Sequence, residues 1–131
     1  MRLNQVTVPL VDYDATVAFY KNLGLVQIVD SPPRYARFEC PTGDGGGAPA
    51  TFSLHAEPDW PVADGALVYF EVDDLDALVA RLKEEGAEVL SEPEDQPYLW
   101  READMRDPSG NRIRLYVAGE NRRFPPWRIK S

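Results

Sequence analysis

Side chains that could bind or act on a small molecule recur at alternate positions in several short segments of the chain. Residues two apart in a β-strand point to the same side of a sheet, so these side chains would share one surface. Its mixture of polar and aromatic groups suits a small organic ligand with one charged group, although the aromatic members could equally serve packing. The candidate ligand-binding residues are Gln5, Thr7, Ser53, His55, Leu67, Tyr69, Glu71, Trp100, Arg114 and Tyr116.

Three of these residues could take part in acid–base or electrostatic chemistry, and each has a structural alternative. Arg114 could bind a carboxylate or enolate oxygen, or it could pair with Glu71 or another carboxylate. His55, the single histidine, could act as a general base or lie solvated at the end of a strand. Glu71 could accept a proton or join an ion pair. The catalytic residues therefore stay unassigned.

An internal repeat indicates which elements position these side chains. Residues 10–28 and 72–90 share one pattern about 62 residues apart, in which Asp12 corresponds to Asp74 and Gly24 to Gly86. The repeat is too long for a solenoid unit and too short for an independent domain. It predicts two small α+β modules that share one sheet surface or barrel.

Each copy of the repeat predicts a strand, a helix and three further strands. An aspartate caps each helix, and a glycine follows its end. The turn DPSGN at 107–111 joins the last two strands. The predicted strands are 3–9, 25–30, 35–40, 50–56, 66–72, 87–90, 98–106 and 111–117, and the predicted helices are 14–23 and 74–85.

The alternation also predicts which strand residues pack against the helices. These are Val6, Val8, Phe52, Leu54, Val68, Phe70, Ile113 and Leu115. The pattern leaves open which side chains of strands 35–40 and 98–106 join the opposite, ligand-facing side. The glycine run at 41–49 leads into a strand rather than a helix N-terminus, so we expect a mobile loop rather than a phosphate site.

Composition places the chain among ordinary globular proteins. It has 131 residues, of which 44% are hydrophobic and 27% charged. No apolar run approaches the roughly 20 residues that span a bilayer, and the N-terminus lacks a signal-peptide pattern. Cys40 is the single cysteine, which excludes a disulfide framework. We expect a cytoplasmic protein that does not bind membranes.

Charge is distributed unevenly along the chain. Residues 119–131 carry a net charge of +3, whereas the total is −8, so the remaining 118 residues carry −11. An acidic body repels phosphate backbones, and we expect no nucleic-acid binding. The basic tail also contains Phe124 and Trp127. We expect these rings to dock on the same subunit or on a partner subunit.

Three segments resemble the vicinal oxygen chelate superfamily, which includes glyoxalase I, bleomycin-resistance proteins and extradiol dioxygenases. They are residues 6–25, 70–89 and 105–115, and the DPSGN turn is the most specific element. The resemblance implies an α+β fold of two tandem βαβββ modules that form an open U-shaped sheet around a cavity, in a homodimer. It places a single domain at 1–118, with modules at about 1–58 and 64–118, before a basic-aromatic tail at 119–131.

The same resemblance implies where a divalent metal would bind in the enzymes of the family. His, Gln or Glu would stand on the first and last strand of each module, and the corresponding residues here are Gln5, Ser53, Leu67 and Arg114. Leucine has no lone pair, and a guanidinium cation repels a metal ion. We therefore predict no metal and no other cofactor.

Two function classes follow from these residues. The first is a metal-free small-molecule-binding protein of the glyoxalase/bleomycin-resistance type. The second is a lyase or isomerase of a small anionic oxo-acid, with Arg114 as electrophile and His55 or Glu71 as base. The predicted partners are a small-molecule ligand and a second copy of the chain. The sequence leaves open whether any reaction is catalysed.

Overall fold

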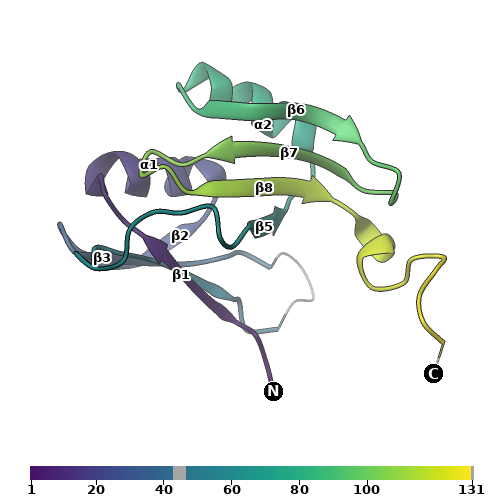
Figure 1. Cartoon of the computed structure of the whole chain (residues 1–131), viewed down its shortest axis with the longest axis horizontal. Coiled ribbons are helices and arrows are strands. Elements are labelled where there is room, and N and C mark those ends of the chain that lie inside the picture. Colours follow the sequence, from purple (N-terminus) through teal and green to yellow (C-terminus); the bar gives the residue numbers. More distant parts are fainter. Residues whose placement is uncertain (43–46, 131) are drawn as a thin grey trace. The chain divides into compact units, whose positions relative to one another are not determined.

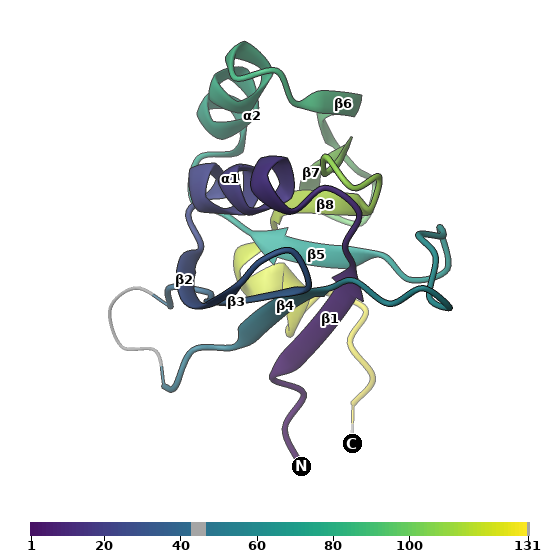
Figure 2. The same cartoon turned by 90° about the vertical axis from the view of Figure 1, so that its left-hand side faces the viewer.

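The structure, a computed structural model, describes residues 1–42 and 47–130 (Figures 1 and 2). The chain divides into two compact units, of which unit 1 contains residues 1–64 and 107–111. Unit 2 contains residues 65–106 and those from 112 onward. The glycines at the centre of the predicted 41–49 loop lie outside the described residues. The assignment of 1–118 to one domain stays a prediction.

Unit 1 is a four-stranded sheet with one helix, in the order predicted from the sequence. The strands lie in the order β1-β4-β3-β2, with β1 parallel to β4 and the other neighbours antiparallel. The elements are β1 (Gln5–Pro9), α1 (Tyr13–Leu23), β2 (Val26–Ser31), β3 (Tyr35–Glu39) and β4 (Thr51–His55).

Unit 2 repeats this topology, which confirms the α+β fold of two βαβββ modules. Its strands lie in the order β5-β8-β7-β6, with β5 parallel to β8 (Figure 1). The elements are β5 (Val68–Glu71), α2 (Leu75–Glu84), β6 (Glu88–Asp95), β7 (Arg101–Arg106), β8 (Arg112–Val117) and the short 3₁₀ helix η1 (Gly119–Arg122).

The repeated aspartates and glycines begin and end the helices. The side chain of Asp12 accepts a hydrogen bond from the Ala15 backbone N–H, and Asp74 accepts one from Ala77, both at 3.2 Å. Each bond satisfies a backbone donor that the first helical turn leaves free. Gly24 follows α1 at a φ of 120°, which a residue with a Cβ adopts only at a cost.

The predicted alternation places apolar side chains of unit 1 against α1. The Tyr20 ring of α1 lies 4.6 Å from the Phe52 ring and 6.0 Å from the Phe38 ring, measured between centroids. Phe38, Phe52 and Leu54 are buried, whereas Gln5 on the opposite parity is exposed. The packing therefore confirms which face of this sheet lies beneath the helix.

Unit 2 buries an equivalent apolar layer. Leu75, Val79 and Leu82 of α2 are buried, and so are the alternate residues Ile113 and Leu115 of β8. Removing each such side chain from water contributes about 1.5–3 kcal/mol before the entropy of ordering is counted. In this sheet too, the structure confirms which alternate strand residues form the buried apolar face.

The DPSGN segment does more than turn the chain between β7 and β8. The buried Asp107 carboxylate accepts hydrogen bonds from the backbone N–H of Ser109 and Asn111, from the Asn111 side chain and from the Tyr20 hydroxyl, at 2.7–2.9 Å. Ser109 also bonds to Thr16 of α1 at 2.7 Å. This segment therefore belongs physically to unit 1.

Two predicted boundaries differ from the structure because of a turn before β7. Leu99 adopts a φ of 68°, and the Leu99 N–H donates to the Gln96 carbonyl at 3.0 Å. Strand β7 consequently begins at Arg101 rather than 98, and Trp100 precedes it. Strand β6 continues to Asp95, beyond the predicted 87–90. Over residues 1–42 and 47–130, no helix is long and apolar enough to cross a membrane.

Candidate functional site

The largest group of candidate residues lies on one face of the unit 2 sheet. Strand register places Tyr69, Arg114 and Asp104 in one row across the sheet. Glu71, Tyr116 and Glu102 form the next row. We call this surface the polar face of unit 2; it comprises Tyr69, Glu71, Glu102, Asp104, Arg112, Arg114 and Tyr116.

Arg114 is engaged by carboxylates of the neighbouring strand. Its Nε lies 2.6 Å from Oδ1 of Asp104, and one terminal nitrogen lies 2.9 Å from Oδ2. The other terminal nitrogen lies 3.5 Å from Glu102 and donates to the Tyr69 hydroxyl at 2.9 Å. The hydrogen bonds to Asp104 raise the pKa of Arg114 further above its usual range, despite burial. The sequence left open a pairing with Glu71 or another carboxylate, and Asp104 and Glu102 fill that role.

Asp104 is the buried centre of this charge network. Arg112 donates to the same carboxylate through Nε at 3.0 Å. Burial alone would raise the pKa of Asp104, but the hydrogen bonds from Arg114 and Arg112 outweigh it and lower that pKa. Two guanidinium groups and one carboxylate thus form a bidentate cluster of the kind that fixes side-chain positions.

Four aromatic rings form a contiguous cluster beside the charge network. Trp100 and Tyr116 are stacked, with centroids 4.8 Å apart and planes inclined by 24°. Tyr69 meets both rings edge-on at 6.0 and 5.5 Å. Tyr98 meets Trp100 edge-on at 5.9 Å. We call Tyr69, Tyr98, Trp100 and Tyr116 the aromatic cluster. Tyr69 and Tyr116 belong to the polar face, and Trp100 and Tyr98 extend it through these ring contacts.

Glu102 links the aromatic cluster to the charge network. Its side chain is 9% exposed. Oε1 accepts a hydrogen bond from the Tyr98 hydroxyl, and this bond raises the pKa of Tyr98 to about 12. Within the described part of the chain, the buried Oε2 atom accepts no hydrogen bond. A buried carboxylate oxygen without a donor is costly, so this atom marks a place where a donor would be stabilised.

The turn before β7 and the start of the tail hold Trp100 in place. The Trp100 indole N–H donates to the Asn121 carbonyl at 3.3 Å, and the Gln96 N–H donates to the Trp100 carbonyl at 2.7 Å. A cleft of about 580 Å³ opens beside the ring, with Leu99, Trp100 and Ala118 among its lining residues. The indole therefore has a stacked neighbour and an adjoining open volume.

Glu71 is directed to the backbone after β8 rather than to Arg114. Its Oε2 accepts hydrogen bonds from the Ala118 and Gly119 N–H groups, both at 2.9 Å. Its Oε1 lies 3.8 Å from Arg122. These bonds give the side chain a structural role at the beginning of η1.

The candidate residues of unit 1 form a separate hydrogen-bonded group. Gln5 Nε2 donates to the Ser53 hydroxyl at 2.9 Å and to Thr7 at 3.1 Å. The Tyr35 hydroxyl bonds to Ser53 at 2.8 Å. His55 lies at the strand end, 3.4 Å from Glu57 and edge-on to the Tyr35 ring.

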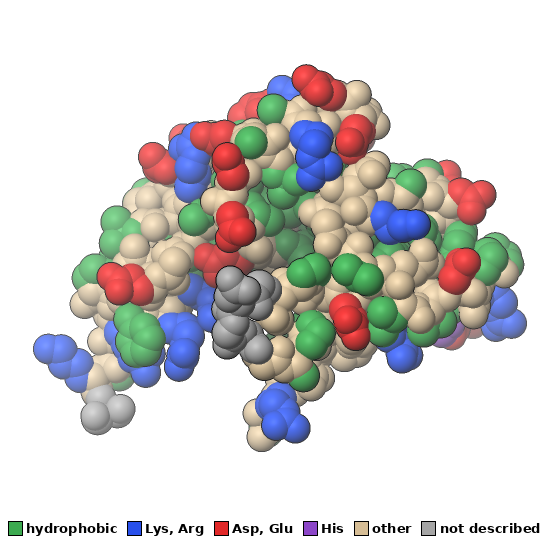
Figure 3. Space-filling model, turned by 180° about the vertical axis from the view of Figure 1, so that it is seen from behind, with side chains coloured by type: hydrophobic (Ala, Val, Ile, Leu, Met, Phe, Trp, Pro, Cys, Tyr) green, Lys and Arg blue, Asp and Glu red, His purple; other side chains and the backbone are tan. Residues whose placement is uncertain are grey.

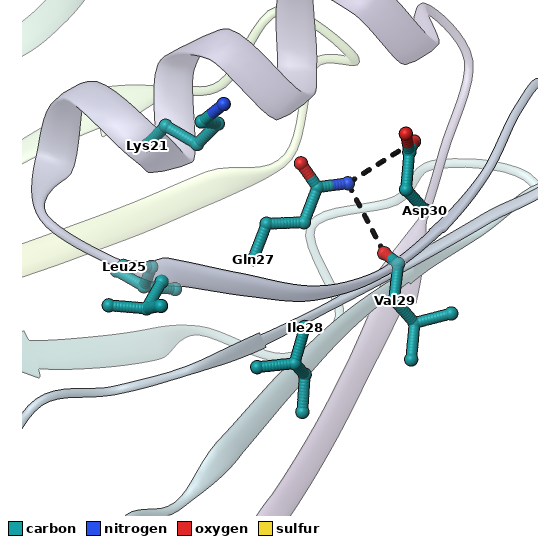
Figure 4. A pocket seen from close by; sticks show the side chains of 7 residues that line it. Lys21, Leu25, Gln27, Ile28, Val29 and Asp30 are labelled. Carbon is teal, nitrogen blue, oxygen red and sulfur yellow. Dashed lines mark hydrogen bonds between the residues drawn. The ribbon is translucent and has the colours of Figure 1, made fainter.

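A pocket of unit 1 lies beside α1, between the helix and strand β2. Figure 4 shows Lys21, Gln27 and Asp30 around it. Gln27 donates to the Val29 carbonyl at 3.2 Å and to Asp30 at 3.4 Å, so its amide is engaged within the strand. None of the predicted ligand-binding residues lines this pocket.

Residues 2–115 match the glyoxalase/bleomycin resistance protein/dioxygenase superfamily. This chain belongs to that superfamily. The match confirms the resemblance drawn from the repeat and the DPSGN turn, and it covers both units. The superfamily includes several reactions and plain binders, so membership alone does not choose between them.

Several solved structures share the fold of this chain. A family enzyme from Burkholderia phytofirmans has a TM-score of 0.72 at 23% identity, covering 90% of this chain and 99% of its own. A lactoylglutathione lyase from Agrobacterium tumefaciens has a TM-score of 0.72 at 21% identity, covering 94% and 97%. TnmS3, an antibiotic binding protein from a Streptomyces species, has a TM-score of 0.71 at 27% identity, covering 91% and 97%.

A curated relative matches a shorter segment. The protein CFP32 of Mycobacterium tuberculosis, whose name as a glyoxylase is provisional, is 44% identical over 55 residues. That match covers 41% of this chain and 21% of the relative, so the chain spans about a fifth of the relative's length.

The residues at the metal positions of the family do not suit a divalent cation. In unit 1, Gln5 and Ser53 bond to each other, and the Tyr35 hydroxyl also contacts Ser53. In unit 2, Leu67 has no donor atom, and Arg114 brings a positive charge. Among the described residues, no three His, Cys, Asp or Glu side chains are grouped so as to hold a metal ion.

Proposed function

We propose that this chain binds a small organic molecule with a planar ring system on the polar face of unit 2, without a metal ion. The Trp100 ring, which stacks on Tyr116 and lines the open cleft, is the observation that carries the proposal. An indole face is a large, rigid surface for stacking, and aromatic pairs gain about 0.5–1.5 kcal/mol beyond the burial of their area. The donors and acceptors around it would orient the bound ring.

The comparison with TnmS3 supports a binding function. That Streptomyces protein is described as antibiotic binding, and its chain is 27% identical to this one over most of its length. A binder needs a shaped and hydrogen-bonded surface but no activated nucleophile or base. The aromatic cluster and the cleft beside Trp100 supply such a surface.

The alternative of an oxo-acid lyase or isomerase has less support. Arg114 would act as its electrophile, but Asp104 and Glu102 already neutralise that guanidinium. Glu71 would act as the base, but it accepts two backbone hydrogen bonds. His55, the other candidate base, lies 3.4 Å from the Glu57 carboxylate. We therefore place binding first.

Thermal unfolding tests the proposal. In the presence of a chelator, planar aromatic compounds that bind are expected to raise the Tm, because a ligand of the native state stabilises it. Zinc, nickel or manganese added alone is expected to leave the Tm unchanged, since Gln5, Ser53, Leu67 and Arg114 do not form a suitable ligand set. Differential scanning calorimetry measures both effects.

Two tryptophan variants provide the matched controls. Trp100→Ala is expected to abolish the ligand-dependent rise, whereas Trp60→Ala is expected to preserve it. Trp60 is also partly exposed, but it lies in unit 1 and outside the aromatic cluster. A metal-dependent rise in Tm that disappears in Gln5→Ala would instead show that the chain binds a metal ion through Gln5, as a metalloenzyme of the family would.

We also propose that the chain forms a homodimer through its tail. Phe124 and Trp127 are 55% and 59% exposed, and Arg123 and Arg128 lie over the Phe124 ring at 5.2 and 4.8 Å. Figure 3 shows basic side chains gathered at its lower left edge, where the C-terminal segment lies. The acidic remainder of a second copy is complementary to this segment in charge. A cytoplasmic location stays a prediction.

Light scattering of the full chain and of a truncation before Gly119 tests the dimer. We expect about twice the chain mass of 14.7 kDa for the full chain and a shift toward monomer after truncation, with salt weakening the association. A full chain that remains monomeric at tens of micromolar contradicts the proposal. A truncated dimer of unchanged affinity shows that the tail does not hold the interface.

A further inference from the structure

We infer that the polar face of unit 2 selects planar aromatic cations that carry an N–H donor, and that Glu102 is the residue that recognises the positive charge. The inference rests on the proposed function and adds the chemical class of the ligand. It also reverses the expectation that Arg114 would attract an anion. Three features of the described residues support it.

The first feature is that the arginines of this face already have anionic partners. Asp104 accepts hydrogen bonds from both Arg112 and Arg114, and Glu102 lies 3.5 Å from Arg114. Two guanidinium groups and two carboxylates sum to zero charge. An anionic ligand would have to displace an intramolecular carboxylate from Arg114, and the displaced group would lose its hydrogen bonds.

The second feature is the unsatisfied oxygen of Glu102. The Tyr98 hydroxyl and Arg114 both approach Oε1, which leaves the buried Oε2 as the acceptor without a donor among the described residues. A carboxylate oxygen only accepts hydrogen bonds, so the group that would satisfy Oε2 is a hydrogen-bond donor. A ligand N–H on a cation would supply the hydrogen bond and the opposite charge together.

The third feature is the position of aromatic faces next to this carboxylate. Tyr98 contacts Glu102 through its hydroxyl and the Trp100 ring through its own ring, so the two recognition groups adjoin. Aromatic faces attract cations through the ring quadrupole, most strongly for tryptophan. The Tyr69 ring of the same cluster already has a cation, Arg114, 5.3 Å from its centroid.

Three probes with the same tricyclic ring system separate charge from stacking. Proflavine is a planar cation with N–H donors at neutral pH, acridine is its neutral counterpart, and acridine carboxylate is the anion. We expect proflavine to bind roughly tenfold or more tightly than the other two, because it alone can form a charge-assisted hydrogen bond with Glu102. Fluorescence titration of the full chain, in a chelator, gives the three Kd values.

Substitution of the carboxylate tests the role of Glu102. Glu102→Gln keeps the shape but removes the charge, and it is expected to eliminate the preference for proflavine while acridine binds as before. Glu84→Gln, which removes an equal charge from an exposed position of α2, is expected to retain the preference. Tyr98→Phe removes one of the two donors to Oε1 and is expected to strengthen proflavine binding. This variant still tests the role of Glu102 if Glu102→Gln does not fold.

The outcomes also distinguish this inference from the proposed function. Equal binding of all three probes, lost in Trp100→Ala, would overturn the cation preference and leave aromatic binding intact. A proflavine preference that persists in Glu102→Gln, or that weakens in Tyr98→Phe, would remove Glu102 from recognition. If none of the probes binds, both the inference and the proposed function are contradicted.

Discussion

Replacing Asp107 with alanine is expected to lower the free energy of unfolding by about 3–5 kcal/mol, because the change orphans several buried donors at once. The carboxylate accepts from two backbone N–H groups, from the Asn111 side chain and from the Tyr20 hydroxyl. Alanine offers none of them an acceptor. The loss should therefore affect both the turn and its attachment to α1.

Urea denaturation measures this effect against two comparison variants. Tyr20→Phe removes one of the donors and should cost about 1–2 kcal/mol. Asp59→Ala, at an exposed position of the same unit, should change the free energy by no more than about 0.5 kcal/mol. If Asp107→Ala lowers the free energy of unfolding no more than Asp59→Ala does, the turn does not stabilise unit 1 as described.

Asp104→Asn is expected to have the second largest effect, about 2–4 kcal/mol near neutral pH. The change weakens the acceptor that Arg112 and Arg114 share, at a position where the carboxylate is buried. Asp95→Asn provides the control. Asp95 also pairs with an arginine, at 3.1 Å, but it is 85% exposed and should contribute at most about 1 kcal/mol.

The effect of Asp104→Asn should depend on pH in a defined direction. Hydrogen bonds from the arginines lower the folded-state pKa of Asp104, so its ionised form stabilises the fold above the unfolded-state pKa of about 3.9. This contribution is lost as the pH falls from that value through the lower folded-state pKa. The difference between wild type and variant should therefore shrink below about pH 4. A constant difference across acidic pH would contradict the role of the carboxylate charge.

The sequence was sufficient to predict the faces of the strands whose alternation is strict. Phe52 and Leu54 alternate with Ser53, and Ile113 and Leu115 alternate with Arg114, so a buried apolar face forces the polar residues to the other side. The aspartates before each helix similarly predicted both helix starts, and the structure identifies Asp12 and Asp74 as the capping residues. These features depend on neighbouring residues, which is why one sequence reveals them.

The partners of Arg114 could not be predicted with the same certainty, because they depend on the register of β7. That register follows from the DPSGN turn, which pairs Arg106 with Arg112 and so places Asp104 opposite Arg114. Counting outward from the turn would have placed Asp104 opposite Arg114 and Glu102 opposite the next inward-facing residue, Tyr116. No local pattern, by contrast, connects Asp107 with Tyr20, 87 residues earlier.

The indole N–H resonances of the protein test the central claim most directly. The chain contains three tryptophans, so a proton–nitrogen correlation spectrum holds three such signals, and Trp100→Phe identifies the one at issue. Titration with proflavine in a chelator is expected to shift the Trp100 signal strongly while the signals of Trp60 and Trp127 change little. A shift confined to Trp60 or Trp127, or a Trp100 shift that requires added metal, would contradict metal-free binding on the polar face of unit 2.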